Sequence, residues 1–261
     1  MTYNRRTMLG LMGGTTLTAM LPTMACAQER GLDLSQQRYD RDRGWRDSVS
    51  VATMTLMVPG RGESVRQMSI SALETDGDGD MSLTEFDLPR DLDGTKFLSH
   101  SFAVQPDDQW LYLPSSGQVR RISSRNKSGA FLGSEFTYED LTSFKVGKYT
   151  YEYAREEAFA DQPCHVIRQV PVYDHTGYSA VNVWLDTEHL RPLKAEFTNR
   201  AGVHFKTLTF TDYTLYQGQF WRAHTAAMAN LTNGRETTMR FDQIAFGVGL
   251  DPSQFSPTRL G

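Results

Sequence analysis

Apolar and polar residues alternate along much of this chain, which is the pattern of β-strands that bury one face and expose the other. An early run places Ala52, Met54, Leu56 and Val58 on one face. Short clusters of Gly, Asn and Asp separate such runs, and these residues accept the positive φ angles that tight hairpins need. We therefore predict a mainly β chain of antiparallel hairpins. The strand-helix-strand alternation of a parallel nucleotide-binding sheet does not occur in the pattern.

Thirteen runs have strand-like character, and we expect about ten or eleven strands because a few runs should merge or fail. The runs span residues 48–58, 64–74, 81–88, 95–102, 110–114, 118–122, 148–159, 163–171, 180–186, 192–199, 203–216, 220–231 and 236–245. An antiparallel sheet of this width curls, and its concave face must be covered or filled if it is apolar. No repeat or low-complexity linker divides the chain, which indicates a single domain over residues 28–261.

Two segments break the strand pattern and are candidates for that cover. Residues 33–43 suit a helix that begins at an Asp33 or Ser35 cap. Residues 124–144 begin polar and then become rich in aromatic side chains. Thr137, with Asp140 three residues later, predicts a short capped helix there. A long non-strand segment in an all-β chain is usually functional or disordered, and the aromatic residues argue against disorder.

Residues 1–27 have the pattern of an export signal. Arg5 and Arg6 precede an uncharged stretch, and the small residues Ala25, Cys26 and Ala27 follow it. The arginine pair resembles a twin-arginine motif, and a general secretory signal is the alternative. We expect cleavage after Ala27 and release into the periplasm. A lipid anchor on Cys26 is the less favoured reading, because Thr occupies the position where a lipobox usually has Leu.

Charge and cysteine content narrow the function classes. Lys and Arg total 27 and Asp and Glu total 31, and removal of residues 1–27 leaves 25 basic and 31 acidic residues. A net charge of −6 argues against a non-specific nucleic-acid binder, which needs a dense basic face. The same cleavage leaves Cys164 as the lone cysteine, in an apolar run where we expect a buried, inert thiol. After residue 27 no apolar run is long enough for a transmembrane helix.

The sequence predicts no metal site and no cofactor. The six histidines lack helical metal-ligand spacing, and no HExxH motif occurs. Residues 76–80 begin like a calcium loop, but Met81 and Asp87 occupy the positions that need Gly and Glu. We interpret this acidic stretch as a tight hairpin. A nucleophile elbow, a phosphate-binding loop and a dinucleotide fingerprint also do not occur.

Two charged groups nevertheless keep other functions open. Asp107, Asp108, Glu139 and Asp140 are the candidate paired carboxylates of an enzyme acting on a lipid or glycan. Their simpler interpretation is a hairpin tip and a helix start. Arg120 and Arg121, with Arg125 and Lys127 nearby, form the local basic cluster. This cluster is either a solvated hairpin edge or a contact for an anionic headgroup or acidic partner.

Three stretches, residues 108–114, 119–122 and 129–141, resemble the outer-membrane lipoprotein-sorting protein family, which is related to the lipoprotein carriers LolA and LolB. Shorter matches are Gly44-Trp45, Leu73-Glu74, Gly79-Asp80, Ser82-Leu83, Gly177-Tyr178, Trp184-Leu185-Asp186, Lys206-Thr207-Leu208 and Gly249-Leu250. The resemblance extends from Arg43 to the C-terminus. It implies an incomplete, strongly curled antiparallel β-barrel with short helices that cover an apolar cavity. It also implies carriage of a lipidic or acylated ligand towards the outer membrane, with an RND-type exporter or an outer-membrane acceptor as partner.

We therefore predict a non-enzymatic periplasmic carrier; the alternatives are an envelope adaptor of an RND-type exporter and a lipid- or glycan-acting enzyme. The predicted cavity and lid residues are Met54, Leu56, Met68, Ile70, Trp110, Tyr112, Phe131, Leu132, Phe136 and Tyr138. Arg120 and Arg121 are the predicted headgroup or partner contacts. The aromatics of residues 131–138 are either a movable lid, in which Phe136→Ala costs little stability, or a plug that completes the core.

Overall fold

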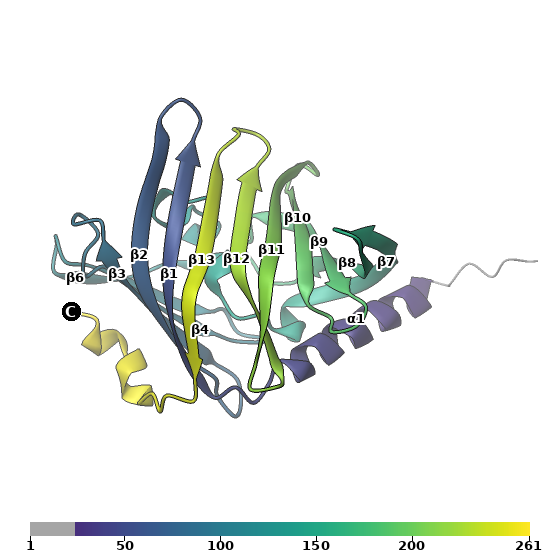
Figure 1. Ribbon diagram of the computed structural model, residues 1–261, viewed down its shortest axis with the longest axis horizontal. Helices are drawn as coiled ribbons and strands as arrows, with labels where there is room; N and C mark the ends of the chain where they lie inside the picture. The colour runs from purple at the N-terminus through teal and green to yellow at the C-terminus, as the bar shows by residue number, and fades with distance from the viewer. Residues whose placement is uncertain (1–23) are drawn as a thin grey trace, which may run out of the picture.

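The computed structural model describes residues 24–261, which form one antiparallel sheet of thirteen strands (Figure 1). The strands are β1 Asp47–Val58, β2 Gly62–Leu73, β3 Asp80–Leu88, β4 Lys96–Ser101, β5 Asp108–Leu113, β6 Gln118–Arg121, β7 Tyr149–Phe159, β8 Gln162–Pro171, β9 Tyr178–Asp186, β10 Pro192–Asn199, β11 His204–Tyr216, β12 Phe220–Asn230 and β13 Glu236–Phe246. All thirteen predicted runs are separate strands, so the expected ten or eleven was too low. Each run has its own turn, which prevents neighbouring runs from merging.

The sheet consists of two meanders joined at their ends. Strands β1 to β6 form one meander and β7 to β13 the other, and β1 pairs with β13 at the centre, where Met54 lies opposite Met239. The outer strands β6 and β7 are the two edges of the sheet and do not pair with each other. This confirms the predicted curled barrel that does not close.

Alternation along the strands places apolar side chains on the concave face. Ala52, Met54 and Leu56 of β1 are buried there, as are Met228 of β12 and Met239 of β13. The predicted inner face of β1 is therefore correct. A register shift between Val51 and Ala52 interrupts the β1–β13 ladder without reversing this assignment.

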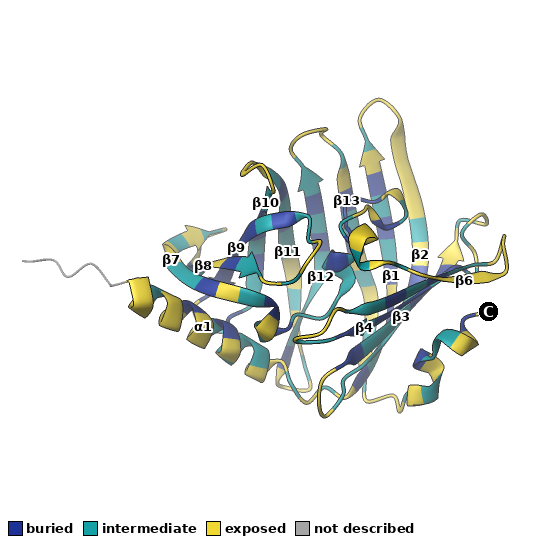
Figure 2. Ribbon diagram, turned by 180° about the vertical axis from the view of Figure 1, so that it is seen from behind, coloured by how far each residue is buried: buried dark blue, intermediate teal, exposed yellow. Residues whose placement is uncertain are grey.

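Residues 122–148 connect the two edge strands and must therefore cross the concave face. Figure 2 shows this connector in front of the sheet, with buried residues along it. It contains four single 3₁₀ turns, η1 Ser124–Asn126, η2 Phe131–Gly133, η3 Glu139–Leu141 and η4 Val146–Lys148. Thr137 and Asp140 cap η3 reciprocally: the Thr137 amide donates to Asp140 Oδ2 (2.7 Å), and the Asp140 amide donates to Thr137 Oγ1 (3.3 Å). The predicted capped helix thus exists as a single turn.

Buried lysines fasten the C-terminal end of the connector. Lys145 Nζ lies 2.6 Å from Asp80 Oδ2 at the start of β3, and both side chains are buried. Lys148 Nζ lies 2.8 Å from Asp107 Oδ2 just before β5. Charges removed from water are tolerated only when they are paired. These ion pairs therefore hold the connector at fixed points on the first meander.

Glu135 fastens the middle of the connector to the second meander. Its carboxylate lies 3.0 Å from Arg235 Nε and accepts a hydrogen bond from Asn230 Nδ2 (2.6 Å). Its carbonyl accepts a hydrogen bond from the buried Lys206 Nζ (2.6 Å), and its amide donates to Thr237 Oγ1 (2.9 Å). The connector is thus bonded to strands on both sides of the open barrel.

The helix α1, Met24–Arg41, begins nine residues before its predicted start. Asp33 and Ser35 are interior positions and not caps; Ser35 is buried and its hydroxyl donates to the Gly31 carbonyl (2.8 Å). A Cβ on Gly31 would lie 2.8 Å from the amide nitrogen of Tyr153, so the glycine lets α1 approach the backbone of the edge strand β7. The prediction missed the first four of these nine residues because they overlap the expected export signal. No helix within residues 24–261 has the length and apolar character needed to span a membrane.

The C-terminal turns η5 Pro252–Phe255 and η6 Pro257–Arg259 cover part of the outer face of the first meander (Figure 1). Phe255 and Leu260 are buried against Leu98 of β4. His100 Nε2 lies 2.9 Å from the Phe255 carbonyl oxygen. These residues form one of two smaller apolar clusters that are separate from the main core.

We expect Lys145→Ala to lower the free energy of unfolding by about 3–5 kcal/mol, because it leaves the buried Asp80 carboxylate without its shortest ion pair. Arg121→Ala is the control. It breaks the more exposed ion pair with Asp108 on β5, for which we expect about 1 kcal/mol or less. Urea unfolding followed by circular dichroism measures both. Equal losses in the two variants would contradict the anchoring role of Lys145.

Candidate ligand-binding cavity

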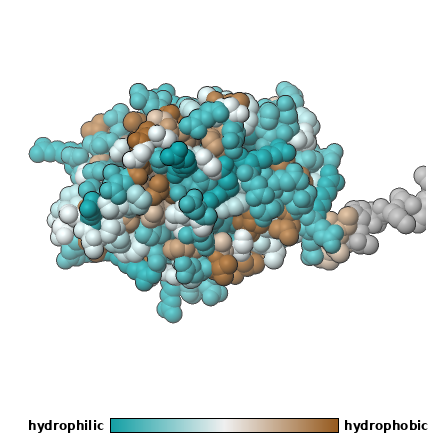
Figure 3. Space-filling model, turned by 90° about the horizontal axis from the view of Figure 1, so that it is seen from below, coloured by the Kyte–Doolittle hydropathy of each residue, from teal (hydrophilic) through white to brown (hydrophobic). Residues whose placement is uncertain are grey.

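A cavity of about 590 Å³ lies between the concave face of the sheet, the end of α1 and the connector. Its interior is lined by apolar side chains from both meanders and the connector: Met68, Ile70, Phe97, Phe131, Phe136, Leu208, Phe210, Met239 and Phe241. Viewed from below, the molecular surface shows hydrophobic residues as separate patches among hydrophilic ones (Figure 3). The cavity is thus an apolar space beneath a surface on which hydrophobic and hydrophilic residues are interspersed.

The period of two along each strand brings these side chains together. Met68 and Ile70 of β2 are two residues apart, as are Leu208 and Phe210 of β11. On β3, Ser82 and Thr84 face the same space and contribute small polar side chains. The connector contributes to the lining through Phe131 and Phe136 without filling the space.

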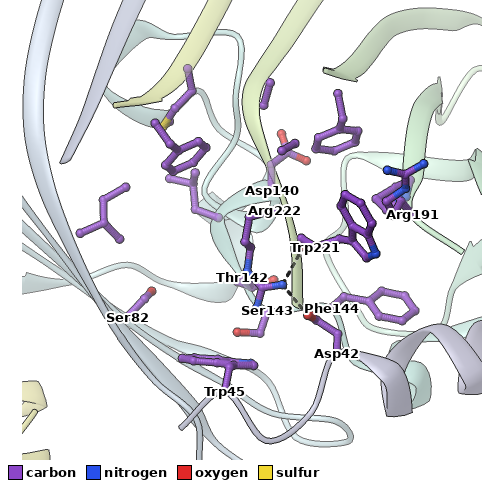
Figure 4. A pocket seen from close by; sticks show the side chains of 18 of the residues that line it. Asp42, Trp45, Ser82, Asp140, Thr142, Ser143, Phe144, Arg191, Trp221 and Arg222 are labelled. Atoms are coloured by element: carbon purple, nitrogen blue, oxygen red, sulfur yellow. Dashed lines mark hydrogen bonds and ion pairs between the residues drawn. The ribbon is translucent and has the colours of Figure 1, made fainter. Parts of the chain in front are cut away.

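The mouth of the cavity carries aromatic and charged side chains (Figure 4). Arg222 of β12 forms an ion pair with Asp42, just after α1. The Arg191 guanidinium lies 4.5 Å from the centre of the Trp221 ring and forms an ion pair with Asp186 (2.9 Å). Cations over aromatic rings combine an apolar surface with a charge, so the mouth differs in chemistry from the apolar interior.

Two adjacent acids, the buried Glu139 and the half-buried Asp140, fix the connector beside the cavity. Asp140 lines the cavity, and its carboxylate accepts hydrogen bonds from the Tyr178 hydroxyl (2.9 Å) and from the Thr137 amide. Glu139 faces the other way and accepts from the Gly177 amide (2.8 Å) and the Tyr173 hydroxyl (3.0 Å). Burial raises the pKa of both carboxyl groups. Their oxygens are occupied by protein donors, so their observed role is structural.

The four carboxylates of the enzyme alternative do not converge. Asp140 lines the cavity, whereas Glu139 bonds to the loop before β9. Asp107 is paired with Lys148, and Asp108 with Arg121. The geometry therefore gives no paired acid and base around a common space.

The predicted cavity residues fall into three groups. Met68, Ile70, Phe131 and Phe136 line the cavity. Met54 and Leu56 are buried in the same core, and Leu132 and Tyr138 pack against it. Trp110 and Tyr112 lie on the opposite face of the sheet, against the C-terminal turns, so their predicted placement was wrong. The inner positions of β5 are Gln109 and Leu111, one residue out of step with our prediction.

The aromatic residues of the connector are built into the core. Phe131 is 1% exposed, and its ring centre lies 5.1 Å from that of Phe97 and 5.4 Å from that of Tyr138. Phe136 is 5% exposed. This burial favours the plug over a loosely held lid, and it argues against our expectation that Phe136→Ala costs little stability.

The basic cluster is smaller than predicted. Arg120 and Arg121 are exposed on the edge strand β6, and Arg121 pairs with Asp108. Lys127 is buried and donates to the Asp107 carbonyl, so it does not belong to a surface patch. The contact role of Arg120 and Arg121 stays a prediction.

Two carboxylates of the acidic stretch at residues 76–80 accept hydrogen bonds from backbone amides of the same chain. Asp80 accepts a hydrogen bond from the Thr75 amide (3.0 Å), and Asp78 accepts one from the Ala103 amide (2.8 Å). Leu73 of β2 lies opposite Met81 of β3, so this stretch does connect a hairpin, although its loop is longer than the tight turn we predicted. Within residues 24–261, no cluster of three or more His, Cys, Asp or Glu side chains could hold a metal ion. Cys164 is 1% exposed, and burial raises the pKa of its thiol.

Sequence reasoning missed the charged residues of the mouth. Arg38, Arg191 and Arg222 come from α1, the β9–β10 turn and β12, and no motif links them. Trp221 was also missed, because an apolar residue at the start of a strand has no distinctive pattern. Trp45, in one of the family-like dipeptides, was the available sequence signal for this part of the cavity.

A family model described as "-like: Uncharacterized protein" matches residues 78–261. A solved outer membrane lipoprotein-sorting protein domain from Vibrio parahaemolyticus is 47% identical, covers 89% of this chain and 99% of its own, and has a TM-score of 0.88. A DUF1329 family protein from Desulfovibrio piger is 28% identical over 90% of this chain and 99% of its own, with a TM-score of 0.86.

A LolA superfamily protein from Nitrosomonas europaea shares the fold at 18% identity, with 87% of this chain and 97% of its own covered and a TM-score of 0.68. The search of curated proteins gave no match.

We expect Asp140→Asn to gain stability relative to the wild type as the pH rises from about 4 to 7. The unfolded Asp carboxyl ionises near pH 3.9, but burial raises the folded pKa, so ionisation subtracts from wild-type stability over this range. Asn does not ionise, and loss of the Asp140 charge also makes Glu139 easier to ionise in the folded variant, which changes the difference in the same direction. Melting temperatures of both proteins across the range measure it. A difference that stays constant or falls with pH would refute the assignment.

Proposed function

This chain belongs to the LolA-like family of outer-membrane lipoprotein-sorting proteins, and from this premise we propose that it is a carrier for a lipidic ligand. The ligand's acyl chain occupies the cavity and its headgroup lies at the charged mouth. The observation that carries the proposal is the apolar space of about 590 Å³ inside an open barrel. Such a space removes an acyl chain from water without any covalent chemistry.

The size of the effect suits reversible carriage. Each buried methylene contributes about 0.8 kcal/mol, so ten of them supply about 8 kcal/mol. Without other costs this corresponds to a dissociation constant of about 1 μM. The aromatic plug around Phe131 keeps the apolar space from collapsing when the ligand leaves. Binding and release then depend on the population of states in which the mouth is open.

The proposed location is the periplasm. The supporting feature is the export pattern of residues 1–27, most of which lies outside the described residues. Cys26 and Ala27 lie in the first turn of α1, and Cys26 is exposed. Cleavage after Ala27 would shorten α1 by its first four residues and leave its packing around Gly31 in place. The alternative of an anchor on Cys26 would attach the carrier to a membrane through this helix.

Transfer needs a donor and an acceptor, and the exposed edge strand β6 is the proposed contact. Its four residues are all exposed, including Arg120 and Arg121. An unpaired edge presents free backbone donors and acceptors to another chain. We propose an RND-type exporter or an outer-membrane acceptor as the partner at this edge. The adaptor alternative uses the same edge but requires no ligand in the cavity.

We expect Ser82→Trp to weaken binding of a neutral fluorescent alkyl probe at least about tenfold, because the indole would occupy the space that the chain needs. Ser69→Trp on β2 is the matched control, since its side chain alternates with the cavity residues Met68 and Ile70 and points to the outer face. Fluorescence titration gives both affinities. If Ser82→Trp binds the probe as the wild type does, the chain does not lie in this cavity.

A further inference from the structure

The mouth of the cavity has an excess of positive charge. Five arginines line the cavity, Arg38, Arg41, Arg43, Arg191 and Arg222. Three acids line it as well, Asp42, Asp80 and Asp140. Most of these residues lie where the end of α1 meets the second meander. A lipid with a neutral headgroup does not require such an arrangement.

The acids of the mouth are already engaged. Asp42 forms an ion pair with Arg222. Asp80 is shared by Lys145 (2.6 Å) and Arg43 (3.3 Å). Asp140 accepts its hydrogen bonds from Tyr178 and the Thr137 amide. Asp42 is also close enough to favour the charged form of Arg38, but none of the three carboxylates forms an ion pair with it.

The other arginines of the mouth also have partners. Arg191 is bound to Asp186 (2.9 Å), and Arg43 has Glu74 (2.8 Å) in addition to Asp80. Arg41 is exposed and donates to the Glu188 carbonyl (3.1 Å). The charges of Arg191 and Arg43 are therefore balanced within the protein, and that of Arg41 is hydrated.

Arg38 is different. It lies in the last turn of α1, half-buried, with its guanidinium 4.3 Å from the centre of the Phe144 ring. Within residues 24–261 it makes no salt bridge and no side-chain hydrogen bond with the protein. Burial lowers the pKa of the guanidinium, because water is removed from the charged form. A cation that is partly desolvated and stacked at an apolar cavity, with its N–H donors unused, is suited to an incoming anion.

We propose that the carried ligand is an anionic amphiphile whose carboxylate or phosphate headgroup binds Arg38. This proposal rests on the proposed function, because it names the class of ligand that occupies the same cavity. The planar fork of the guanidinium matches both headgroups through two parallel hydrogen bonds. Phe144 holds the fork from one side, and the acyl chain extends from it towards Leu208 and Phe210. The acylated end of a lipoprotein, which lacks such an anion, is then not the preferred cargo.

The test compares amphiphiles that share a dodecyl chain and differ in headgroup. Dodecanoate and dodecyl phosphate are the anionic ligands, dodecanol is neutral and dodecyltrimethylammonium is cationic. Each competes with the neutral fluorescent probe below its micelle concentration at pH 7.5. We expect the wild type to bind an anionic ligand about tenfold or more tightly than dodecanol, in line with a charge-assisted hydrogen bond. The tighter of the two anions identifies the headgroup.

Three variants assign the preference to Arg38. Arg38→Gln should lose the anionic preference, measured as the ratio of anion to dodecanol affinity within the same variant, whereas Arg38→Lys should keep most of it. Arg38→Glu should prefer the cationic ligand. Arg30→Gln, on the same helix but away from the cavity, should behave as the wild type. Melting temperatures verify that each variant is folded.

The outcomes separate this proposal from the proposed function. If dodecanol and the anions bind equally well to the wild type, the carrier function stands and the anionic ligand is wrong. An anionic preference that survives in both Arg38→Gln and Arg38→Glu also overturns the assignment. If neither neutral nor charged amphiphiles bind the wild type, the carrier function itself fails.

Discussion

The architecture depends on one topological constraint: β6 and β7 follow each other in the chain but lie at opposite edges of the sheet. The pairing of β1 with β13 imposes this arrangement, because it joins the two meanders at the centre and leaves their far ends free. The connector of residues 122–148 therefore has to cross the concave face. A closed barrel would have buried its inner side chains against each other. In this open barrel, the connector covers the concave face instead and leaves part of the space unfilled.

Where the connector crosses the apolar face, its charged side chains are removed from water, which is costly. Each of these charges is paired with an opposite charge or a polar partner. The connector contributes Glu135, Lys145 and Lys148, and each meets a partner on a strand or beside one. Because a buried ion is costly without its partner, these pairs specify where the connector lies more than they stabilise it. The cavity is what remains between these fixed points. Its apolar walls and charged mouth thus follow from how the connector is held.

The strands were largely predictable, because a period of two and turn residues of special geometry are local signals. The inner face of β1 and β2 followed from the same alternation, which identified Met54 and Met68. The inner face of β5 could not be predicted in this way, because this strand carries apolar side chains on both faces: Trp110 and Tyr112 on the outer face and Leu111 on the inner one. The outer cluster formed by the C-terminal turns is a long-range feature that the pattern of β5 alone does not contain.

The candidate site was predictable only in part, because most of its residues come together only through long-range folding. Phe131 and Phe136 stood out because aromatic residues interrupted a strand pattern. Arg38, Arg191 and Trp221 belong to three elements that meet only after folding, so their sequence neighbourhoods are ordinary. The buried Lys145 was missed because lysine is normally a surface residue and its partner Asp80 lies 65 positions earlier in the chain.

The central claim is that the cavity carries a lipidic ligand. Native mass spectrometry of the protein purified without detergent from its own envelope tests it most directly. The account predicts an added mass at a ratio of one ligand to one protein, which is lost on denaturation and recovered as an amphiphile in the organic extract. Protein that shows its own mass alone, and gains none after incubation with lipid extract of the same cells, would contradict it.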